Sequence, residues 1–511
     1  MSAHFELSET TFLASVTAPG EQESDVVFIP VFEGDDGLVD APGLDAATGG
    51  EVGRARQSGE FRAKFCHHFI TPVQSGWRAR RVALIGAGRH GDFDAERQRQ
   101  VAATCAHLSR RVRASRVACV VRGVSDPIAG AQHAADGMSA ADFLTATFKK
   151  DGDLPGPLPK TVTIVATGAD QAGLAGSVRR GRIIGESANV ARALANEPAN
   201  VLTPREFAAR ASAEGGRSGL TVDVLDEYRL RELGMRLVLA VGQGSAEPPR
   251  LVVLRHDPLG ASDQPLLALV GKGVTFDTGG VSIKPSEGMD RMKYDMSGGA
   301  AVIGAMRAIA RLDVPRRVVG IVPMVENMVG SKATRPGDVV AGANGKTVEI
   351  NNTDAEGRLI LADALWYATH LGASHLVDVA TLTGSCMVAL GNHVSGLMGG
   401  PAAWTSEVQT AAERAGDRFW TLPIYREARE QMRSEIADLI NTGGRPGGAI
   451  TAAAFLREFT NGLPWAHIDI AGTAWAEKAE PSQPKGPTGV AVRALIELAT
   501  SGSYPSPPRA D

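Results

Sequence analysis

Two carboxylates separated by one residue lie in a polar loop that follows a short apolar segment. The apolar residues end at Ile350, Asp354 and Glu356 follow, and an apolar stretch then begins after Gly357. Ligands in open α/β sheets usually bind beyond the carboxyl ends of strands. Two acids this close repel each other unless cations lie between them. The stretch therefore predicts a cation site, with a solvated acidic turn as the open alternative.

A second stretch, also at the end of an apolar strand, supplies more charged groups. The strand at 267–270 is followed by a glycine-rich segment that contains Lys272, Asp277, Lys284 and Asp295. The two stretches together offer four carboxylates and two amines, with neither histidine nor cysteine. Such oxygen-rich ligands suit two divalent cations about 3.5–4 Å apart. Mn²⁺, Zn²⁺ and Mg²⁺ all tolerate this set.

The order and spacing of these residues resemble a known family. The sequence Asn-Thr-Asp-Ala-Glu-Gly-Arg-Leu at 352–359 is similar to the signature of the leucyl aminopeptidase family of dinuclear metallo-aminopeptidases. Residues 270–280 resemble the upstream lysine–aspartate motif of that family, and the likeness covers most of residues 185–495. The resemblance implies an enzyme that hydrolyses the N-terminal residue from short peptides through a water that bridges two metal ions.

The resemblance also implies a ligand set. The ligands would be Asp277 and Glu356, which bridge both ions, Asp354 at one ion, and Asp295 with the amine of Lys272 at the other. An amine ligand must be deprotonated, and a free lysine has a pKa of about 10.4, so the cation must depress this pKa heavily. The alternative is that Lys272 serves as a counter-ion for the acids.

Two further cationic residues match catalytic residues of the family. Lys284 would face the substrate carbonyl and stabilise the developing oxyanion, an interaction that can contribute about 3–4 kcal/mol. Arg358, at the start of a helix, would hold a bicarbonate that acts as general base toward the bridging water. The alternatives are a surface lysine and an arginine paired with one of the site acids.

A third set of residues matches the family's substrate-binding positions. The set consists of Met292, Asn352, Thr381, Leu382 and Gly384. An apolar pocket near Met292 would prefer leucine-like or methionine-like N-terminal side chains. Because such a pocket gains only about 1–3 kcal/mol per methylene, we expect broad specificity.

Two other features have simpler interpretations. The sequence Gly-Ala-Gly-Arg-His-Gly at 86–91 matches G-x-G-x-x-G after a predicted strand, but the next strand ends at 121–123 without the acid that a dinucleotide site needs. We therefore favour an ordinary glycine turn over a dinucleotide site. His467 lies in an apolar strand, where a core histidine is commoner than a metal ligand.

Composition limits the partners and the compartment. The chain has 511 residues and a formal net charge of −4, which gives no general reason to expect nucleic acid or an anionic membrane as partner. The few cysteines, no apparent secretory signal and no apolar run of membrane-spanning length predict a cytoplasmic protein without membrane attachment. By resemblance, we expect a homohexamer. Some bacterial members of the family also bind DNA, a role that nothing here assigns to particular residues.

Alternating strand-like and helix-like segments predict an α/β protein with two domains. Residues 1–180 would form an N-terminal α/β domain with a mainly parallel sheet, whose role stays open between assembly and regulation. A long helix, predicted at 179–195, joins it to a larger catalytic α/β domain at 181–511, with a mixed central sheet flanked by helices. Further predicted helices include 131–148, 297–311 and 425–440.

Overall fold

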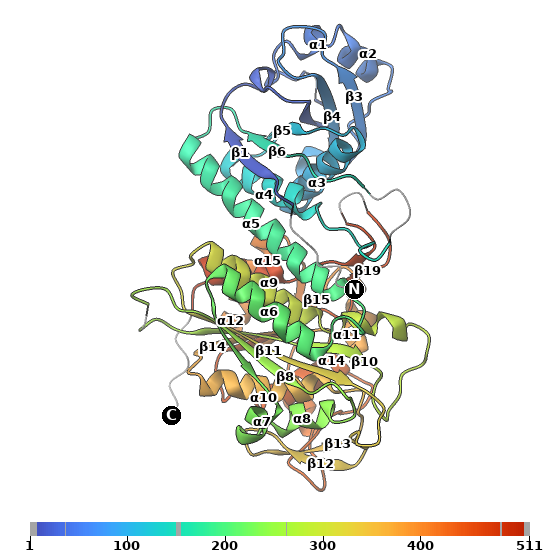
Figure 1. Cartoon of the computed structure of the whole chain (residues 1–511), viewed down its shortest axis with the longest axis vertical. Helices are drawn as coiled ribbons and strands as arrows, with labels where there is room; N and C mark the ends of the chain where they lie inside the picture. Colours follow the sequence, from blue (N-terminus) through green and yellow to red (C-terminus); the bar gives the residue numbers. More distant parts are fainter. Residues whose placement is uncertain (1–7, 36, 150–154, 262, 481–482, 505–511) are drawn as a thin grey trace. The chain divides into compact units, whose positions relative to one another are not determined.

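The computed structural model describes residues 8–35, 37–149, 155–261, 263–480 and 483–504. The chain forms two compact units, one of residues 1–189 with 478–485 and one of residues 190–477 with 486–511 (Figure 1). The boundary between residues 189 and 190 lies within helix α5 (Gln171–Asn196), and residue 180 is in the same helix.

The first unit contains a six-stranded sheet in the order β1-β6-β5-β2-β4-β3. All neighbouring strands are parallel except β3, which is antiparallel to β4. The strands are β1 (Thr11–Ser15), β2 (Val26–Phe32), β3 (His68–Pro72), β4 (Arg81–Gly88), β5 (Arg116–Val120) and β6 (Thr161–Val165). The helices besides α5 are α1 (Leu44–Ala47), α2 (Glu51–Gln57), α3 (Ala95–Arg111) and α4 (Pro127–Ala140).

Strand β2 shows how this sheet builds two cores. All its residues are buried, as expected for a parallel strand covered on both faces. Alternate side chains point to opposite faces, so Val26 and Phe28 pack with residues of α3 and α4. Val27 and Ile29 pack on the other face with residues of α1 and α2.

The second unit contains a nine-stranded mixed sheet. Its strand order is β16-β15-β18-β14-β9-β11-β8-β7, and β10 pairs with the end of β11. The strands are β7 (Thr221–Leu225), β8 (Arg250–His256), β9 (Leu267–Gly271), β10 (Gly273–Asp277), β11 (Val318–Asn327), β14 (His375–Ala380), β15 (Ser395–Gly400), β16 (Phe419–Thr421) and β18 (Trp465–Asp469). Strands β18, β14, β9 and β11 run parallel, and so does β10 against β11. Their carboxyl ends therefore meet at one edge of the sheet.

Helices cover both faces of this sheet (Figure 1). One face packs against α6 (Pro204–Ser218), α9 (Ser297–Arg311) and α12 (Ala402–Ala415), and α15 (Val492–Ser501) packs on α9 and α12. The other packs against α8 (Arg236–Gly242), α10 (Gly357–His370) and α14 (Gly448–Arg457). Within the described residues, no helix has the length and apolar character needed to cross a membrane.

Shorter elements complete the chain. The helices are α7 (Glu227–Glu232), α11 (Gly384–Leu390) and α13 (Arg426–Glu430), with 3-10 turns η1 (Pro19–Glu21), η2 (His90–Asp92) and η3 (Met289–Tyr294). A small sheet joins β12 (Asp338–Ala341), β13 (Thr347–Ile350) and β17 (Leu439–Ile440), and a second joins β19 (Trp475–Ala476) and β20 (Gly486–Pro487).

Two predicted helices differ from the structure. The helix predicted at 425–440 ends at Glu430, because the chain turns back and Leu439–Ile440 pairs with β13. The helix predicted at 131–148 starts earlier, at Pro127, and ends at Ala140. Asp126 caps its start by accepting hydrogen bonds from two backbone N–H groups, and proline is well suited to the first helical position.

The buried carboxylate of Asp363 ties three segments of the second unit together. It lies on α10 and is fully buried. One carboxylate oxygen accepts hydrogen bonds from the backbone N–H groups of Leu237 and Val238, at the start of α8, and the other accepts from Ala343. The N–H groups of the fully buried Leu237 and Val238 would otherwise lack partners, so Asp363 fixes α8 against α10, and its bond to the partly buried Ala343 holds the turn there.

We expect Asp363→Asn to lower the free energy of unfolding by about 1–3 kcal/mol, because the amide keeps one acceptor oxygen and leaves at least one buried N–H unpaired. Urea denaturation measures the change. Asp313→Asn is the matched control and should have no effect, because Asp313 is exposed and asparagine tolerates its left-handed backbone conformation. Equal midpoints for the two variants would contradict the structural role of Asp363.

Candidate metal centre

The charged residues of the two sequence stretches meet at the carboxyl edge of the large sheet. Lys272 follows β9 directly, Asp277 is the last residue of β10, and Thr381 follows β14. Glu356 occupies the N-cap position of α10, which begins after the polar loop at 351–355. The strand ends therefore place these side chains together, as the sequence predicts for neighbouring parallel strands.

Three carboxylates form the centre of the cluster. Asp277, Asp354 and Glu356 each offer an oxygen, and these three oxygens lie within 4.8 Å of one another. Asp295 joins through the buried amine of Lys272, whose Nζ lies 2.8 Å from Asp295 Oδ2 and 2.7 Å from Glu356 Oε1. All five predicted metal-binding residues thus belong to one cluster.

Lys284 contacts the other side of the same cluster. Its amine lies 2.8 Å from Asp277 Oδ2 and forms a second ion pair with Asp354 Oδ1. The side chain is 21% exposed, so it is neither a surface lysine nor fully enclosed. In this structure each lysine amine is a counter-ion for two of the four carboxylates.

The two ligand-bearing loops are cross-linked by polar side chains that the sequence analysis did not identify. Asn327, at the end of β11, donates from Nδ2 to Asp277 Oδ1 at 2.8 Å and to the carbonyl of Thr353 at 3.0 Å. The Thr353 hydroxyl donates to the carbonyl of Gly279 at 2.6 Å. In the sequence, Asn327 is marked only as a polar residue at a strand end. Its role becomes recognisable once β11 is known to pair with β10, because that pairing places Asn327 beside Asp277.

The residues present fit a divalent cation. Glu356 is buried, and its Oε2 atom has no hydrogen-bond partner among the described residues. A buried carboxylate oxygen without a partner is costly, and a metal ion would satisfy it. The donor set is carboxylate oxygen with one amine nitrogen, which suits Mn²⁺, Zn²⁺ or Mg²⁺.

The charge balance of the cluster also favours a cation. Burial alone would lower the pKa of Lys272, but the carboxylates of Asp295 and Glu356 raise it above its ordinary value. Against burial, Asp277 and the other acids raise the pKa of Lys284 as well. Burial and the charge of Glu356 raise the pKa of Asp277 to about 6. Two amines therefore do not compensate four carboxylates, and a divalent cation would.

Arg358 is held near the cluster by α10. Only 6% of the residue is exposed, and its Nη1 donates to the carbonyl of Asn441 at 2.7 Å. Its Nε is buried without a hydrogen-bond partner among the described residues. Burial lowers the pKa of Arg358 to about 10, while the charges of Glu356 and Asp469 act in the opposite direction. Arg358 thus keeps unused donor capacity at a helix start.

A cavity of about 250 Å³ lies against the cluster. It is lined by the five predicted metal ligands, Lys284 and Arg358, and by Met292, Thr381, Leu382 and Gly384 from the predicted substrate-binding set. Asn352 is outside this lining. Its side-chain oxygen accepts from the N–H of Asp354 at 2.9 Å, so it shapes the ligand loop. Six lining residues lie outside the predicted site set: Tyr294, Ala355, Gly357, Thr383, Met387 and Ala471.

The loop at 381–384 is anchored by a buried acid on the neighbouring strand. Asp469, at the end of β18, accepts hydrogen bonds from the Leu382 N–H at 3.2 Å and from the Thr383 hydroxyl at 2.7 Å. Asp469 is fully buried. This anchor fixes the backbone groups of the loop where they line the cavity.

His467 and the glycine-rich segment at 86–91 have structural roles. His467 is fully buried and pairs through Nδ1 with Asp378 Oδ1 at 2.6 Å. Gly86 lies within β4, and a Cβ atom there would come within 1.9 Å of the carbonyl oxygen of Lys64. Gly86 is therefore explained by a close backbone approach within the strand, and not by the glycine turn that the sequence favoured.

Comparison with known proteins decides the family. Residues 189–496 match the catalytic domain of the cytosol aminopeptidase family, and residues 28–152 match the N-terminal domain of that family. The chain belongs to the cytosol aminopeptidase family. The resemblance found in the sequence is confirmed, and with it the assignment as a metallo-exopeptidase and the two-domain α/β fold.

Individual relatives match over nearly their whole length. A probable cytosol aminopeptidase of Solibacter usitatus is 46% identical over 480 residues, which are 94% of this chain and 97% of that protein. A mutant of tomato leucine aminopeptidase has a TM-score of 0.86 at 31% identity and covers 96% of each chain. The bottromycin maturation enzyme BotP in complex with Mn has a TM-score of 0.80 at 36% identity, with 93% of this chain and 99% of that chain covered.

In this cytosol aminopeptidase family member, Gly357 leaves the space that Lys272 occupies. A Cβ atom at Gly357 would lie 2.7 Å from Lys272 Cε and 2.8 Å from its Nζ. We expect Gly357→Ala to displace the amine and to lower peptidase activity roughly a hundredfold, the cost of about 1 Å of misplacement. Activity measured with circular dichroism separates this loss from misfolding.

Gly216→Ala is the matched control for this prediction. Gly216 lies in α6, where an added Cβ would meet nothing within 4 Å. We expect its activity to equal that of the wild type. Full activity in Gly357→Ala would show that the position of the Lys272 amine does not matter.

Proposed function

We propose that the chain hydrolyses the N-terminal residue from short peptides with two divalent cations held at the carboxyl edge of the large sheet. The observation that carries the proposal is the carboxylate cluster, with three oxygens within 4.8 Å, beside a cavity of about 250 Å³. Asp277 and Glu356 would be shared between the ions, as the family resemblance implies. Both belong to the three-carboxylate centre, where Glu356 pairs with Lys272 and Asp277 pairs with Lys284.

The contacts of the remaining predicted ligands assign each of them to one of the two ions. Asp354 would serve the ion nearer Lys284, and Asp295 with the Lys272 amine would serve the other. Two bound cations would supply an activated water and would polarise the substrate carbonyl. The Mn complex of the related BotP supports manganese as one candidate.

The chain itself contributes charge and orientation. The Lys284 amine lines the cavity, so its positive charge can stabilise the oxygen that becomes negative when water adds to the peptide carbonyl. The loop anchored by Asp469 would hold the peptide through the backbone of Leu382 and Gly384. The carbon–nitrogen bond would then break, and the leaving amine would take up the proton that the general base removed from the attacking water.

Arg358 would hold a bicarbonate that serves as general base. Its Nε lacks a protein partner, it lines the cavity, and it sits in the first turn of α10, where backbone N–H groups also favour an anion. A bicarbonate there would explain how the site removes a proton from water without a histidine in the lining.

The lining supports a preference for apolar N-terminal side chains. Met292, Leu382 and Met387 supply apolar surface beside the charged, hydroxyl-bearing and small residues that also line the cavity. Methionine is flexible and adapts to different apolar shapes. We therefore propose leucine- and methionine-like side chains as preferred, with broad tolerance.

The metal requirement is tested by chelation followed by addition of Mn²⁺, Zn²⁺ or Mg²⁺. We expect a Leu-initiated dipeptide to be cleaved only after a metal is restored, and its N-acetylated form not to be cleaved. Asp354→Asn should lower kcat/KM at least about a hundredfold. Mutation of a residue that only hydrogen-bonds to a metal ligand already lowers metal affinity or activity about 10–100-fold, and Asp354 is a proposed ligand itself.

The control for this variant is Asp313→Asn, an exposed acid away from the cluster. Circular dichroism should show that both variants fold. Cleavage by the chelated enzyme, or wild-type activity in Asp354→Asn, would remove the two-metal proposal.

We also propose that the chain assembles as a homohexamer, as the family resemblance implies. Exposed apolar side chains support an assembly: Val281, Ile283 and Val329 are 45%, 63% and 55% exposed, and the first two lie in the loop that leads to Lys284. Sedimentation equilibrium should give six times the chain mass of 53.4 kDa. A monomeric mass at micromolar concentration would contradict the proposal.

A further inference from the structure

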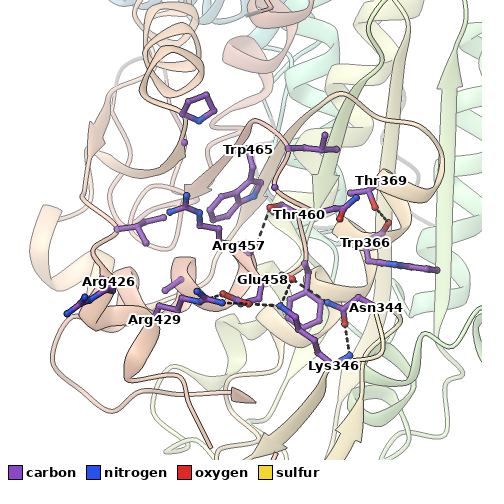
Figure 2. Close-up of a pocket in the computed structure, with 18 of the residues that line it drawn as sticks. Asn344, Lys346, Trp366, Thr369, Arg426, Arg429, Arg457, Glu458, Thr460 and Trp465 are labelled. Carbon is purple, nitrogen blue, oxygen red and sulfur yellow. Dashed lines mark hydrogen bonds and ion pairs between the residues drawn. The ribbon is translucent and has the colours of Figure 1, made fainter. Parts of the chain in front are cut away.

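A second, larger cavity lies in the catalytic unit, away from the metal centre. Its volume is about 900 Å³, within the usual range for small-molecule sites. It lies between the ends of α10 and α14, the start of α13, the turn at 342–346 and the first residue of β18 (Figure 2). We call it the arginine cavity, after Arg426, Arg429 and Arg457 in its lining.

The arginine cavity is separate from the cavity at the metal centre. Trp465, the first residue of β18, lines the arginine cavity, whereas Asp469, the last residue, anchors the loop at the metal centre. Four residues of extended strand span about 13 Å. The two cavities share no lining residue, so a ligand in the arginine cavity would not occupy the peptide site.

Positive charge is concentrated in this lining. It contains four cationic side chains, Lys346, Arg426, Arg429 and Arg457, and one carboxylate, Glu458. The whole chain has a formal net charge of −4, so the excess of positive charge is local. A cleft lined by charge of one sign attracts ligands of the opposite sign.

Glu458 holds two of these cations in place. Lys346 Nζ and Arg429 Nε each lie 2.5 Å from one of its carboxylate oxygens. Burial alone would raise the pKa of Glu458, but the hydrogen bonds from Lys346 and Arg429 lower it below its ordinary value. The acid therefore stays ionised, and Figure 2 shows it between the two cations.

The other two arginines keep more donor capacity. Arg457 makes no side-chain hydrogen bond or ion pair with any residue that the structure describes. Arg426 has one ion pair, to Glu430 at 3.3 Å, and is 81% exposed. An arginine guanidinium has five N–H donors in a planar fork that fits a carboxylate or a phosphate.

Aromatic side chains supply an apolar surface next to these cations. Trp366 and Tyr425 line the cavity and keep part of their surface exposed, whereas Trp465, also in the lining, is only 1% exposed. The indole N–H of Trp465 donates to Asp378 Oδ2 at 2.7 Å, so its polar atom is already satisfied away from any ligand. Flat apolar groups pack favourably on such rings.

We propose that the arginine cavity is a second ligand site, for a small molecule that joins an anionic group to a flat or aromatic body. Arg457 and Arg426 bind the carboxylate or phosphate, and the aromatic side chains contact the body. The site does not depend on the aminopeptidase reaction, since none of its residues lines the metal-centre cavity.

The test is calorimetric titration of the metal-loaded, full-length protein with three probes. AMP carries a phosphate and an aromatic base, N-acetyl-L-phenylalanine carries a carboxylate and a phenyl ring, and adenosine has no anionic group. The acetyl group removes the free amine that an aminopeptidase site would recognise. We expect saturable binding of one or both anionic probes and much weaker binding of adenosine.

Variants locate the binding. Arg457→Gln and, separately, Arg426→Gln should each weaken the anionic probe about tenfold, as expected for loss of a charge-assisted hydrogen bond. The matched control is Arg433→Gln, an exposed arginine outside the lining, which should bind like the wild type. Unchanged peptidase activity in all three variants would show that they fold.

The outcomes are distinct. Binding of AMP alone identifies a phosphate ligand, and binding of N-acetyl-L-phenylalanine alone identifies a carboxylate ligand. The proposal is wrong if neither anionic probe binds, if adenosine binds as tightly as AMP, or if binding persists unchanged in both Arg457→Gln and Arg426→Gln. The last result would place an anionic probe at the metal centre.

Discussion

The buried amine of Lys272 is the interaction on which the arrangement of the metal centre depends. It contacts Asp295, Glu356 and the carbonyl oxygen of Thr381, at 2.7–2.9 Å. These three groups come from separate segments, so one nitrogen holds three parts of the chain together. A buried charge whose partner is removed costs several kcal/mol. The fold therefore has to bring the carboxyl ends of β9 and β14 and the start of α10 to the same point.

The same constraint explains the polar clamps around the centre. Asn327 connects Asp277 to the carbonyl of Thr353, and Asp469 connects β18 to the loop at 381–384. Four acids within a small volume repel each other. The loops that carry them therefore need hydrogen bonds from other parts of the chain, such as those of the neutral Asn327 and of Asp469 on β18, to keep their positions. The anchors also hold the predicted ligands in place, which would lower the ordering cost of binding a metal.

The sequence predicts much of this because the chemistry is local. The ligand loops follow directly after short apolar strands, and the residues at 352–359 carry the family resemblance that comparison confirms. The helix at Ser297–Arg311 has the predicted bounds. Fold class and the two-domain organisation follow from the alternation of strands and helices. The roles assigned to individual site residues stay predictions.

The remaining features depend on pairing between distant segments. Asn327 and Asp277 are 50 positions apart, and Leu382 and Asp469 are 87 apart. No local pattern connects such residues until the strand order is known. The incorrect helix at 425–440 has the same origin, since pairing with β13 overrides the local preference of Leu439–Ile440. The arginine cavity is likewise assembled from α10, α13, α14 and two loops.

The division of the chain within α5 has a practical consequence for separating the two units. The boundary between residues 189 and 190 lies inside the continuous helix α5, where a cut would leave backbone N–H and C=O groups without hydrogen-bond partners. The chain returns to the first unit at residues 478–485 and then goes back to the second. Neither unit is therefore a single uninterrupted piece of the gene product. Simple truncation yields fragments with a broken helix or a missing segment, and autonomous expression of the peptidase part requires redesign of both junctions.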